Sequence, residues 1–228
     1  MKSTYYPGFE FLYDAVAAVA VRIQKHTYYP VMAIARFNLD LLSWGYLLSP
    51  RSHTKGKTWW TRPTEIACIA IYFVLYFYVL LYSSIPTWTS RALFLLTSHL
   101  ITMPLHVQIT LSHWGTSTSD LGPGESFAQR QLRTTMDVSC PAWLDFVHGG
   151  LQFQVVHHLF PRVPRHNLRA LQVLVREFCA ETEIEYMIHG FKAGNGVVLN
   201  RLQEVAEQAR MMAACQKHMA ETGESGLH

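Results

Sequence analysis

The stretch TEIACIAIYFVLYFYVLLYSSI, residues 64–85, decides the fold class, because it is apolar over a length that can cross a bilayer. Its one charged residue, Glu65, stands at the edge. A helix of this length is ~33 Å long, against a hydrocarbon core of ~30 Å. Trp59, Trp60 and Trp88 stand near its ends, where aromatic side chains favour the membrane interface. The stretch therefore predicts a transmembrane helix.

A second apolar stretch, ALFLLTSHLITMPLHVQITL at residues 92–111, follows a short link and predicts a second span. A third, Val31–Leu48, contains Arg36, Asn38 and Asp40 and predicts an interfacial or re-entrant helix. The expected fold class is an all-α membrane protein, a transmembrane helical hairpin with a cytosolic helical cap. Its expected parts are cytosolic or interfacial helices (1–63), the hairpin (64–111) and the cap (112–228).

The charges of the chain predict its orientation. Residues 1–63 contain eight Lys or Arg and residues 112–228 contain ten, whereas the link between the spans contains only Arg91. Because positive residues favour the cytosolic side of a membrane, both termini are expected to be cytosolic. A net charge of +3 is too weak to indicate nucleic-acid binding. The four cysteines form no CxxC pair and predict reduced thiols.

The cap is expected to contain two amphipathic helices. Pro161 and Pro164 are expected to end the helix that precedes these prolines. Asn167 is expected to cap a helix over 167–180, and a second helix is expected over 200–220. Residues 190–196 contain three glycines and predict a loop.

A basic stripe of three arginines lies around these prolines, at Arg162, Arg165 and Arg169. Such a stripe is typical of a surface that faces solvent or lipid headgroups. A role at a functional site is the alternative. Arg162 and Arg165 are further candidates for contact with an acidic electron donor.

A cluster of metal-binding side chains is predicted near residue 154. If that segment is helical, Gln154, His157 and His158 share one face, since residues at i, i+3 and i+4 are neighbours on a helix. Neutral imidazole suits iron, zinc and copper. A surface histidine pair in a chain with twelve histidines is the alternative.

Three more histidines follow each other at intervals of seven in the second span, His99, His106 and His113. They lie along one stripe of a helix. Histidines inside a bilayer are rare, and they usually face a helix bundle or a site. We expect His113, at the cytosolic end, to be a ligand beside the later pair. His99 and His106 are expected to be hydrogen-bonded within a bundle, with direct metal ligation as the alternative.

The segments LSHW (111–114), TTMDVSCPAWLDFVHGGLQFQ (134–154) and VVHHLFPRVPRHNLR (155–169) resemble the C-terminal part of front-end membrane desaturases. The likeness extends to HVQITLSH (106–113) and, more loosely, to RLQEVAEQAR (201–210). The variant third histidine box, Gln-x-x-His-His, is specific to that group. The sphingolipid delta-8 desaturases are the subgroup that the segments resemble most.

The resemblance implies an oxidoreductase of lipid metabolism in the endoplasmic reticulum membrane. Members of this family carry two irons held by three histidine boxes, and they use O2 with electrons from cytochrome b5 and its reductase. They introduce a double bond into a ceramide, a sphingoid base or a fatty acyl chain. The implied metal positions are His113, Gln154, His157 and His158, with His106 and His148 in a supporting role at most.

Two features of the family are missing from the sequence. The first two boxes, of the types HxxxH and HxxHH, do not occur, nor does the His-Pro-Gly-Gly of a fused cytochrome b5 domain. The chain is therefore expected to be a C-terminal piece of a desaturase. We expect it to be inactive alone, or active only when a partner completes it.

Several other functions stay open. A lipid hydroxylase or a delta-6 or delta-5 acyl desaturase keeps the same third box. A non-catalytic membrane fragment, or a regulatory partner of a full-length desaturase, belongs to a different class. Zinc or haem bound for a structural purpose is a third alternative.

Overall fold

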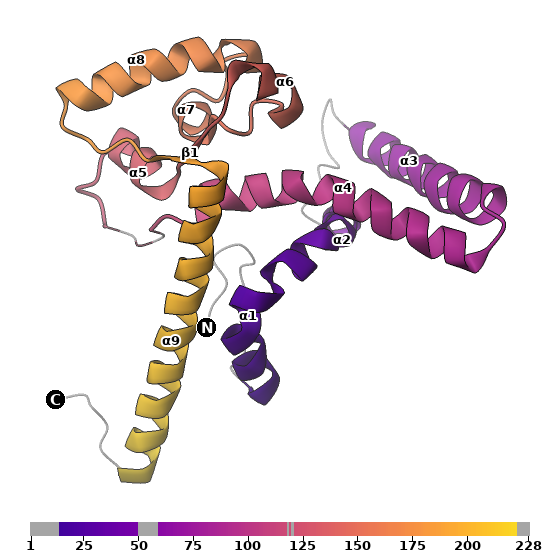
Figure 1. Ribbon diagram of the computed structural model, residues 1–228, viewed down its shortest axis with the longest axis horizontal. Coiled ribbons are helices and arrows are strands. Elements are labelled where there is room, and N and C mark those ends of the chain that lie inside the picture. The colour runs from indigo at the N-terminus through magenta and orange to yellow at the C-terminus, as the bar shows by residue number, and fades with distance from the viewer. Residues whose placement is uncertain (1–13, 50–58, 118, 120, 223–228) are drawn as a thin grey trace. The chain divides into compact units, whose positions relative to one another are not determined.

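The computed structural model of the protein describes residues 14–49, 59–117, 119 and 121–222. Of the predicted segment 1–63, residues 1–13 and 50–58 lie outside this described part. The chain divides into two compact units, one made of Met1–Tyr28 with Gln108–His228 and the other of Tyr29–Val107. Its elements are α1 (Ala15–Ala33), α2 (Ala35–Leu48), α3 (Thr61–Phe73), the π-helix η2 (Val74–Ser84), α4 (Trp88–Trp114), α5 (Phe127–Thr134), β1 (Asp137–Ser139), η3 (Ala142–Leu144), α6 (Asp145–His148), α7 (Gln154–Leu159), η4 (Arg165–Asn167), α8 (Leu168–Glu181), β2 (Ile188–Gly190) and α9 (Phe191–Thr222) (Figure 1).

Two helices of the described chain are long and apolar enough to cross a membrane, and they contain the two predicted spans. One is formed by α3 and η2 together, Thr61–Ser84, and the other is α4, Trp88–Trp114. No residue of α3 or η2 is fully buried, and many of their large apolar side chains are exposed. Such a surface favours a lipid surrounding. The predominantly helical structure and these two spans confirm the predicted fold class.

The turn between the two spans is held by Arg91. Its guanidinium donates to the carbonyl oxygens of Tyr82 at 2.6 Å and of Ile85 at 2.9 Å. It also lies over the rings of Tyr82 and Trp88, 4.8 and 4.7 Å from their centres. Because the last carbonyls of a helix have no partner within that helix, Arg91 satisfies groups that the end of η2 leaves open.

The predicted interfacial segment 31–48 is helical, with a break at Ile34 between α1 and α2. Arg36 donates to the hydroxyl oxygen of Tyr72 at 2.5 Å and of Ser98 at 3.3 Å. Its guanidinium also lies 4.8 Å from the centre of the Tyr76 ring. The positive charge of Arg36, which disfavours a full membrane crossing, thus has hydroxyl and aromatic partners within its own compact unit. Where this helix lies in a membrane stays a prediction.

His99 is a buried histidine with bundle contacts, as the sequence predicted. Its Nδ1 lies 3.2 Å from the carbonyl oxygen of Ala33, and its ring stacks on Phe37 with 4.3 Å between centres. These contacts give the imidazole a packing role between α2 and α4.

The cap has a core built around α7, which contacts α5, α8 and β1 (Figure 1). The buried side chains of this core are Leu132, Phe153, Val155, Val156, Leu168, Val175 and Cys179. The amphipathic helix predicted over 167–180 is confirmed as α8. Asn167 stands at its N-cap position, but its side chain makes no capping hydrogen bond, so that part of the prediction is wrong. All four cysteines are free thiols, as expected.

The predicted glycine loop at 190–196 is wrong, because α9 begins at Phe191 and runs through it. Just before α9, β2 pairs in parallel with β1, with Asp137 opposite Ile188. Gly194 is buried, and a Cβ atom there would lie 2.9 Å from Cδ2 of Leu111. The glycine therefore serves a close approach between helices, and this packing outweighs its low helix propensity.

Two glycines of α9 give a matched test of this close approach. Gly194→Ala is expected to lower stability, because Leu111 is fully buried and overpacking costs ~1–3 kcal/mol. Gly196→Ala is expected to raise stability by up to ~1 kcal/mol, since a Cβ atom there meets nothing within 4 Å. Thermal unfolding in detergent, followed by circular dichroism, measures both. Equal shifts for the two variants would contradict the packing role of Gly194.

Candidate metal centre

The histidine-bearing helix α7 is positioned by a buried carboxylate. Asp137, on β1, is fully buried, and its Oδ1 accepts a hydrogen bond from the backbone N–H of Val155 at 2.7 Å. Its Oδ2 accepts from Nε2 of Gln172 at 2.7 Å and from the hydroxyl of Tyr186. Burial raises the pKa of Asp137, and these three hydrogen bonds oppose the rise. The carboxylate thus ties the start of α7 to α8 and to the segment before β2.

The convergence of Gln154 and His158 on one side of α7 is confirmed. Nε2 of Gln154 lies 3.1 Å from Nε2 of His158. On the other side of the imidazole, Nδ1 lies 2.9 Å from Oε1 of Gln131 on α5. A carboxamide oxygen can only accept, so in this arrangement Nδ1 carries the proton and the lone pair of Nε2 faces the Gln154 amide. The Gln154 amide donates to that lone pair, and a metal ion would compete for it.

The other two predicted imidazoles lie next to this one. The ring centre of His113, at the end of α4, is 5.1 Å from that of His158, and the ring centre of His157 is 6.1 Å away. Burial lowers the pKa of His158, and positive charge on His113 or His157 would lower it further. A low pKa keeps the ring neutral, which is the form that binds metals. We call His113, Gln154, His157 and His158 the histidine cluster.

The histidine cluster matches part of a metal site. Its donors are imidazoles, and a ligating histidine usually donates its other ring N–H to a carbonyl or carboxylate, as His158 does to Gln131. Within the ranges that the structure describes, however, no group of three His, Cys, Asp or Glu side chains could hold a metal ion. The donor types of the cluster, imidazole and amide, are ones that a transition metal accepts, and among the described residues they do not form a three-ligand group.

Gln131 is a site residue that the sequence analysis missed. It lies 27 residues before His158, and it reaches the imidazole only because α5 packs against α7. A polar residue on a short amphipathic helix gives no signal in the sequence that it orients a histidine.

The two histidines expected to support the metal ligands, His148 and His106, lie in different parts of the structure. His148 is half-buried at the end of α6, and within the described residues no hydrogen bond or ring contact joins it to the histidine cluster. His106 is half-buried on α4, seven residues before His113, and belongs to the compact unit of Tyr29–Val107. Its Nδ1 has no hydrogen-bond partner among the described residues.

The predicted basic stripe does not act as one surface. Arg169 makes a bidentate ion pair with Asp145, at 2.6 and 2.5 Å, and lies over the ring of Phe153. This hydrogen-bonded pairing lowers the pKa of Asp145. Arg165 donates to the carbonyl oxygen of Gly149 at 3.0 Å. Arg162 is exposed. Two of the three arginines therefore stabilise the segment before α7.

Comparison with known proteins identifies the family of the chain. The family model described as fatty acid desaturase matches residues 11–190. A Delta 8-(E)-sphingolipid desaturase of Emericella nidulans is 50% identical over the whole chain, and that of Lachancea kluyveri is 52% identical over 97% of it. A Delta(8)-fatty-acid desaturase of Helianthus annuus is 36% identical over 89% of the chain.

The matches cover only part of these relatives. The chain spans 42% of the length of the Emericella nidulans protein, 39% of the Lachancea kluyveri protein and 43% of the Helianthus annuus protein. No solved structure matches. Because the family model covers most of the chain and full-chain identity reaches one half, the chain belongs to the fatty acid desaturase family.

Proposed function

We propose that the chain forms the part of a sphingolipid delta-8 desaturase that contributes the third set of iron ligands. The complete enzyme would introduce a double bond into a sphingoid base. The overall change converts CH2–CH2 into CH=CH. O2 is reduced to two waters by two electrons from the substrate and two from cytochrome b5. Bound iron would supply the oxygen chemistry.

Each member of the histidine cluster has a proposed role. His113, His157 and His158 would donate imidazole nitrogens to iron. Gln131 would hold the His158 ring with its Nε2 facing the metal, and Gln154 would bind the metal or a group beside it. The remaining ligands would come from residues outside these 228. Alone, the chain would be inactive.

The observation that best supports this proposal is the close approach of the His113 ring to the His158 ring. Residues 45 positions apart bring their ring centres to 5.1 Å, in a chain half identical to a Delta 8-(E)-sphingolipid desaturase. A surface histidine pair would need neither a partner from α4 nor an acceptor from α5. The two apolar spans and the family's lipid-directed relatives support a membrane location. The endoplasmic reticulum and cytosolic termini are parts of the proposal.

A graft tests the proposed function. The matching segment of the Emericella nidulans relative is replaced by this chain, and the graft is expressed in a host whose sphingolipids lack the delta-8 double bond. We expect delta-8-unsaturated long-chain bases, measured by chromatography and mass spectrometry. The chain expressed alone is expected to give none.

The controls separate the alternatives. A stably expressed graft that yields no unsaturated base would contradict the proposal. A new double bond in fatty acyl chains would favour an acyl desaturase, the second candidate, which the similarity to the Helianthus annuus protein supports. Product from the chain alone would overturn the proposed need for further ligands.

A further inference from the structure

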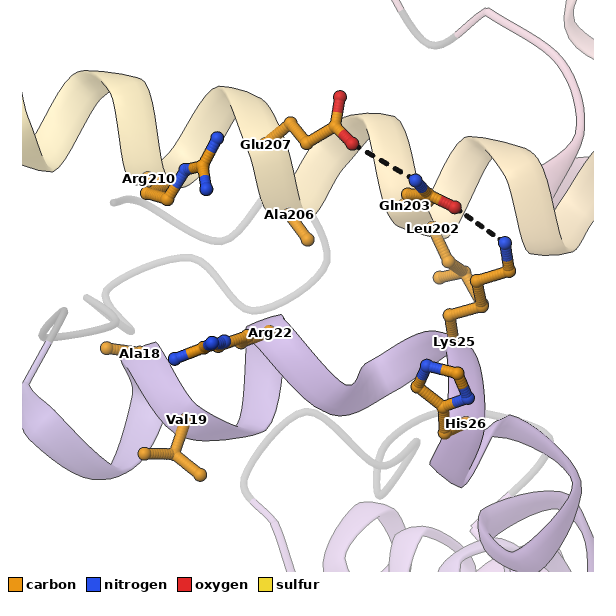
Figure 2. A pocket seen from close by; sticks show the side chains of 10 residues that line it. All are labelled: Ala18, Val19, Arg22, Lys25, His26, Leu202, Gln203, Ala206, Glu207 and Arg210. Atoms are coloured by element: carbon orange, nitrogen blue, oxygen red, sulfur yellow. Dashed lines mark hydrogen bonds between the residues drawn. The ribbon is translucent and has the colours of Figure 1, made fainter.

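A groove lies between α1 and α9, lined by parts of the two helices that belong to the same compact unit, and shares no residue with the histidine cluster (Figure 2). Its volume is about 560 Å³. Nε2 of Gln24 donates to the carbonyl oxygen of Leu202 at 2.7 Å, and Nζ of Lys25 donates to Oε1 of Gln203 at 2.5 Å. These two contacts join the walls and fix which residues of α1 face which residues of α9.

The groove has an excess of positive charge. Arg22 and Lys25 lie on the α1 wall and Arg210 on the α9 wall, against a single carboxylate, Glu207. Figure 2 shows that Gln203 stands between Lys25 and Glu207, whose Oε1 accepts from the Gln203 amide at 3.1 Å.

The guanidinium groups of Arg22 and Arg210 form no ion pair within the described part of the chain. Neither of them makes a side-chain hydrogen bond there, and both residues are exposed. Cations on both walls of one groove repel each other, and an anion between them relieves that repulsion. Guanidinium forks suit the oxygens of a phosphate in particular.

The rest of the lining is apolar. Ala18 and Val19 on α1, with Leu202 and Ala206 on α9, share the groove with the arginines. Free phosphate would gain nothing from these side chains. A phosphate ester with a hydrocarbon chain uses both kinds of surface, and a volume of this size suits a small headgroup with its first methylenes.

We propose that the groove between α1 and α9 binds an anionic membrane phospholipid, with its phosphate between Arg22 and Arg210 and its first methylenes against Val19 and Ala206. This site is separate from the desaturation chemistry and does not depend on it. The two helices long and apolar enough to cross a membrane support a membrane location, where such a lipid is available.

The test uses the 228-residue chain purified in detergent. Binding of phosphatidic acid and of phosphatidylcholine is titrated by native mass spectrometry, with glycerol 3-phosphate as a soluble competitor. Phosphatidic acid is expected to bind at least about tenfold more tightly than the zwitterionic lipid. In Arg22→Gln/Arg210→Gln this preference is expected to fall about tenfold or more, since two cations near the phosphate are lost.

A matched control removes the same two charges elsewhere. Arg130→Gln/Arg176→Gln changes two exposed arginines of α5 and α8 that do not line the groove, and it is expected to keep the preference. Val19→Asp, which adds a negative charge to the apolar lining, should weaken phosphatidic acid binding without removing a cation. Circular dichroism checks that each variant is folded.

Two outcomes would overturn the proposal. Equal losses in the groove variant and in the control would mean that total charge, and not this groove, attracts the lipid. Displacement of the lipid by an equal concentration of glycerol 3-phosphate would assign the site to free phosphate.

Discussion

His158→Ala is expected to lower the iron content of the grafted desaturase at least about tenfold and its delta-8 product about a hundredfold. The imidazole is the centre of the histidine cluster, since Gln154, Gln131 and His113 all lie against it. Its loss removes a proposed ligand and the ring that organises the others. Elemental analysis of the purified graft, with long-chain base analysis of the cells, measures both effects.

Variants of Gln131 and His166 test whether the effect of His158→Ala is specific to the histidine cluster. Gln131→Leu keeps every ligand but removes the acceptor for Nδ1–H, and it is expected to weaken iron binding by ~10–100-fold. Gln131→Glu keeps an acceptor and should restore most of that loss. His166→Ala removes an exposed imidazole of η4 and should change neither the iron content nor the amount of delta-8 product. Iron and product that persist in His158→Ala would show that the histidine cluster is not the metal centre.

Asp137→Ala is expected to destabilise the unit that contains α7 by ~3–5 kcal/mol, because it removes a buried carboxylate that has three hydrogen-bond donors. The N–H of Val155 and the side chains of Gln172 and Tyr186 would remain buried without their acceptor. In a domain of this size such a loss corresponds to roughly 10 °C in the melting temperature. Thermal unfolding of the 228-residue chain in detergent is the measurement.

Milder substitutions at Asp137 distinguish the contributions of its hydrogen bonds. Asp137→Asn keeps an acceptor for Val155 but turns an amide toward two other donors, so its effect is expected to lie between wild type and alanine. Adding Tyr186→Phe removes one of those conflicts and should restore part of the loss. Glu177→Ala on the exposed side of α8 should leave the melting temperature nearly unchanged. A melting temperature of Asp137→Ala within a degree of wild type would contradict the bridging role.

The sequence predicted those features that depend on spacing along one element. Apolar length predicted the spans, and helical periodicity placed Gln154 beside His158. Features that depend on a second element were missed. Gln131 and Asp137 act across 27 and 18 residues, and Arg169 forms an ion pair 24 residues away that its place in a basic stretch did not suggest. Composition alone does not show which distant partner a polar side chain will find.

Two local predictions, the glycine loop and the helix cap at Asn167, were wrong. Gly194 favours a loop by propensity, but its contact with Leu111 fixes it in a helix. Asn167 stands where a cap is expected, yet no capping hydrogen bond forms. At Gly194 tertiary packing outweighs a helix-propensity cost of about 1 kcal/mol.

The hydrogen bond from Tyr186 to Asp137 spans 49 residues, and it has a consequence for the order of events during synthesis. A ribosome adds roughly 5–20 residues per second, so His157 and His158 leave it about 1.5–6 s before β2 can pair with β1. Until Tyr186 and Ile188 arrive, one oxygen of the carboxylate that anchors α7 lacks its tyrosine donor. On the proposed function, iron ligands on α7 would thus reach their final positions only after the chain has been made as far as β2, and metal loading would be a late step in biogenesis.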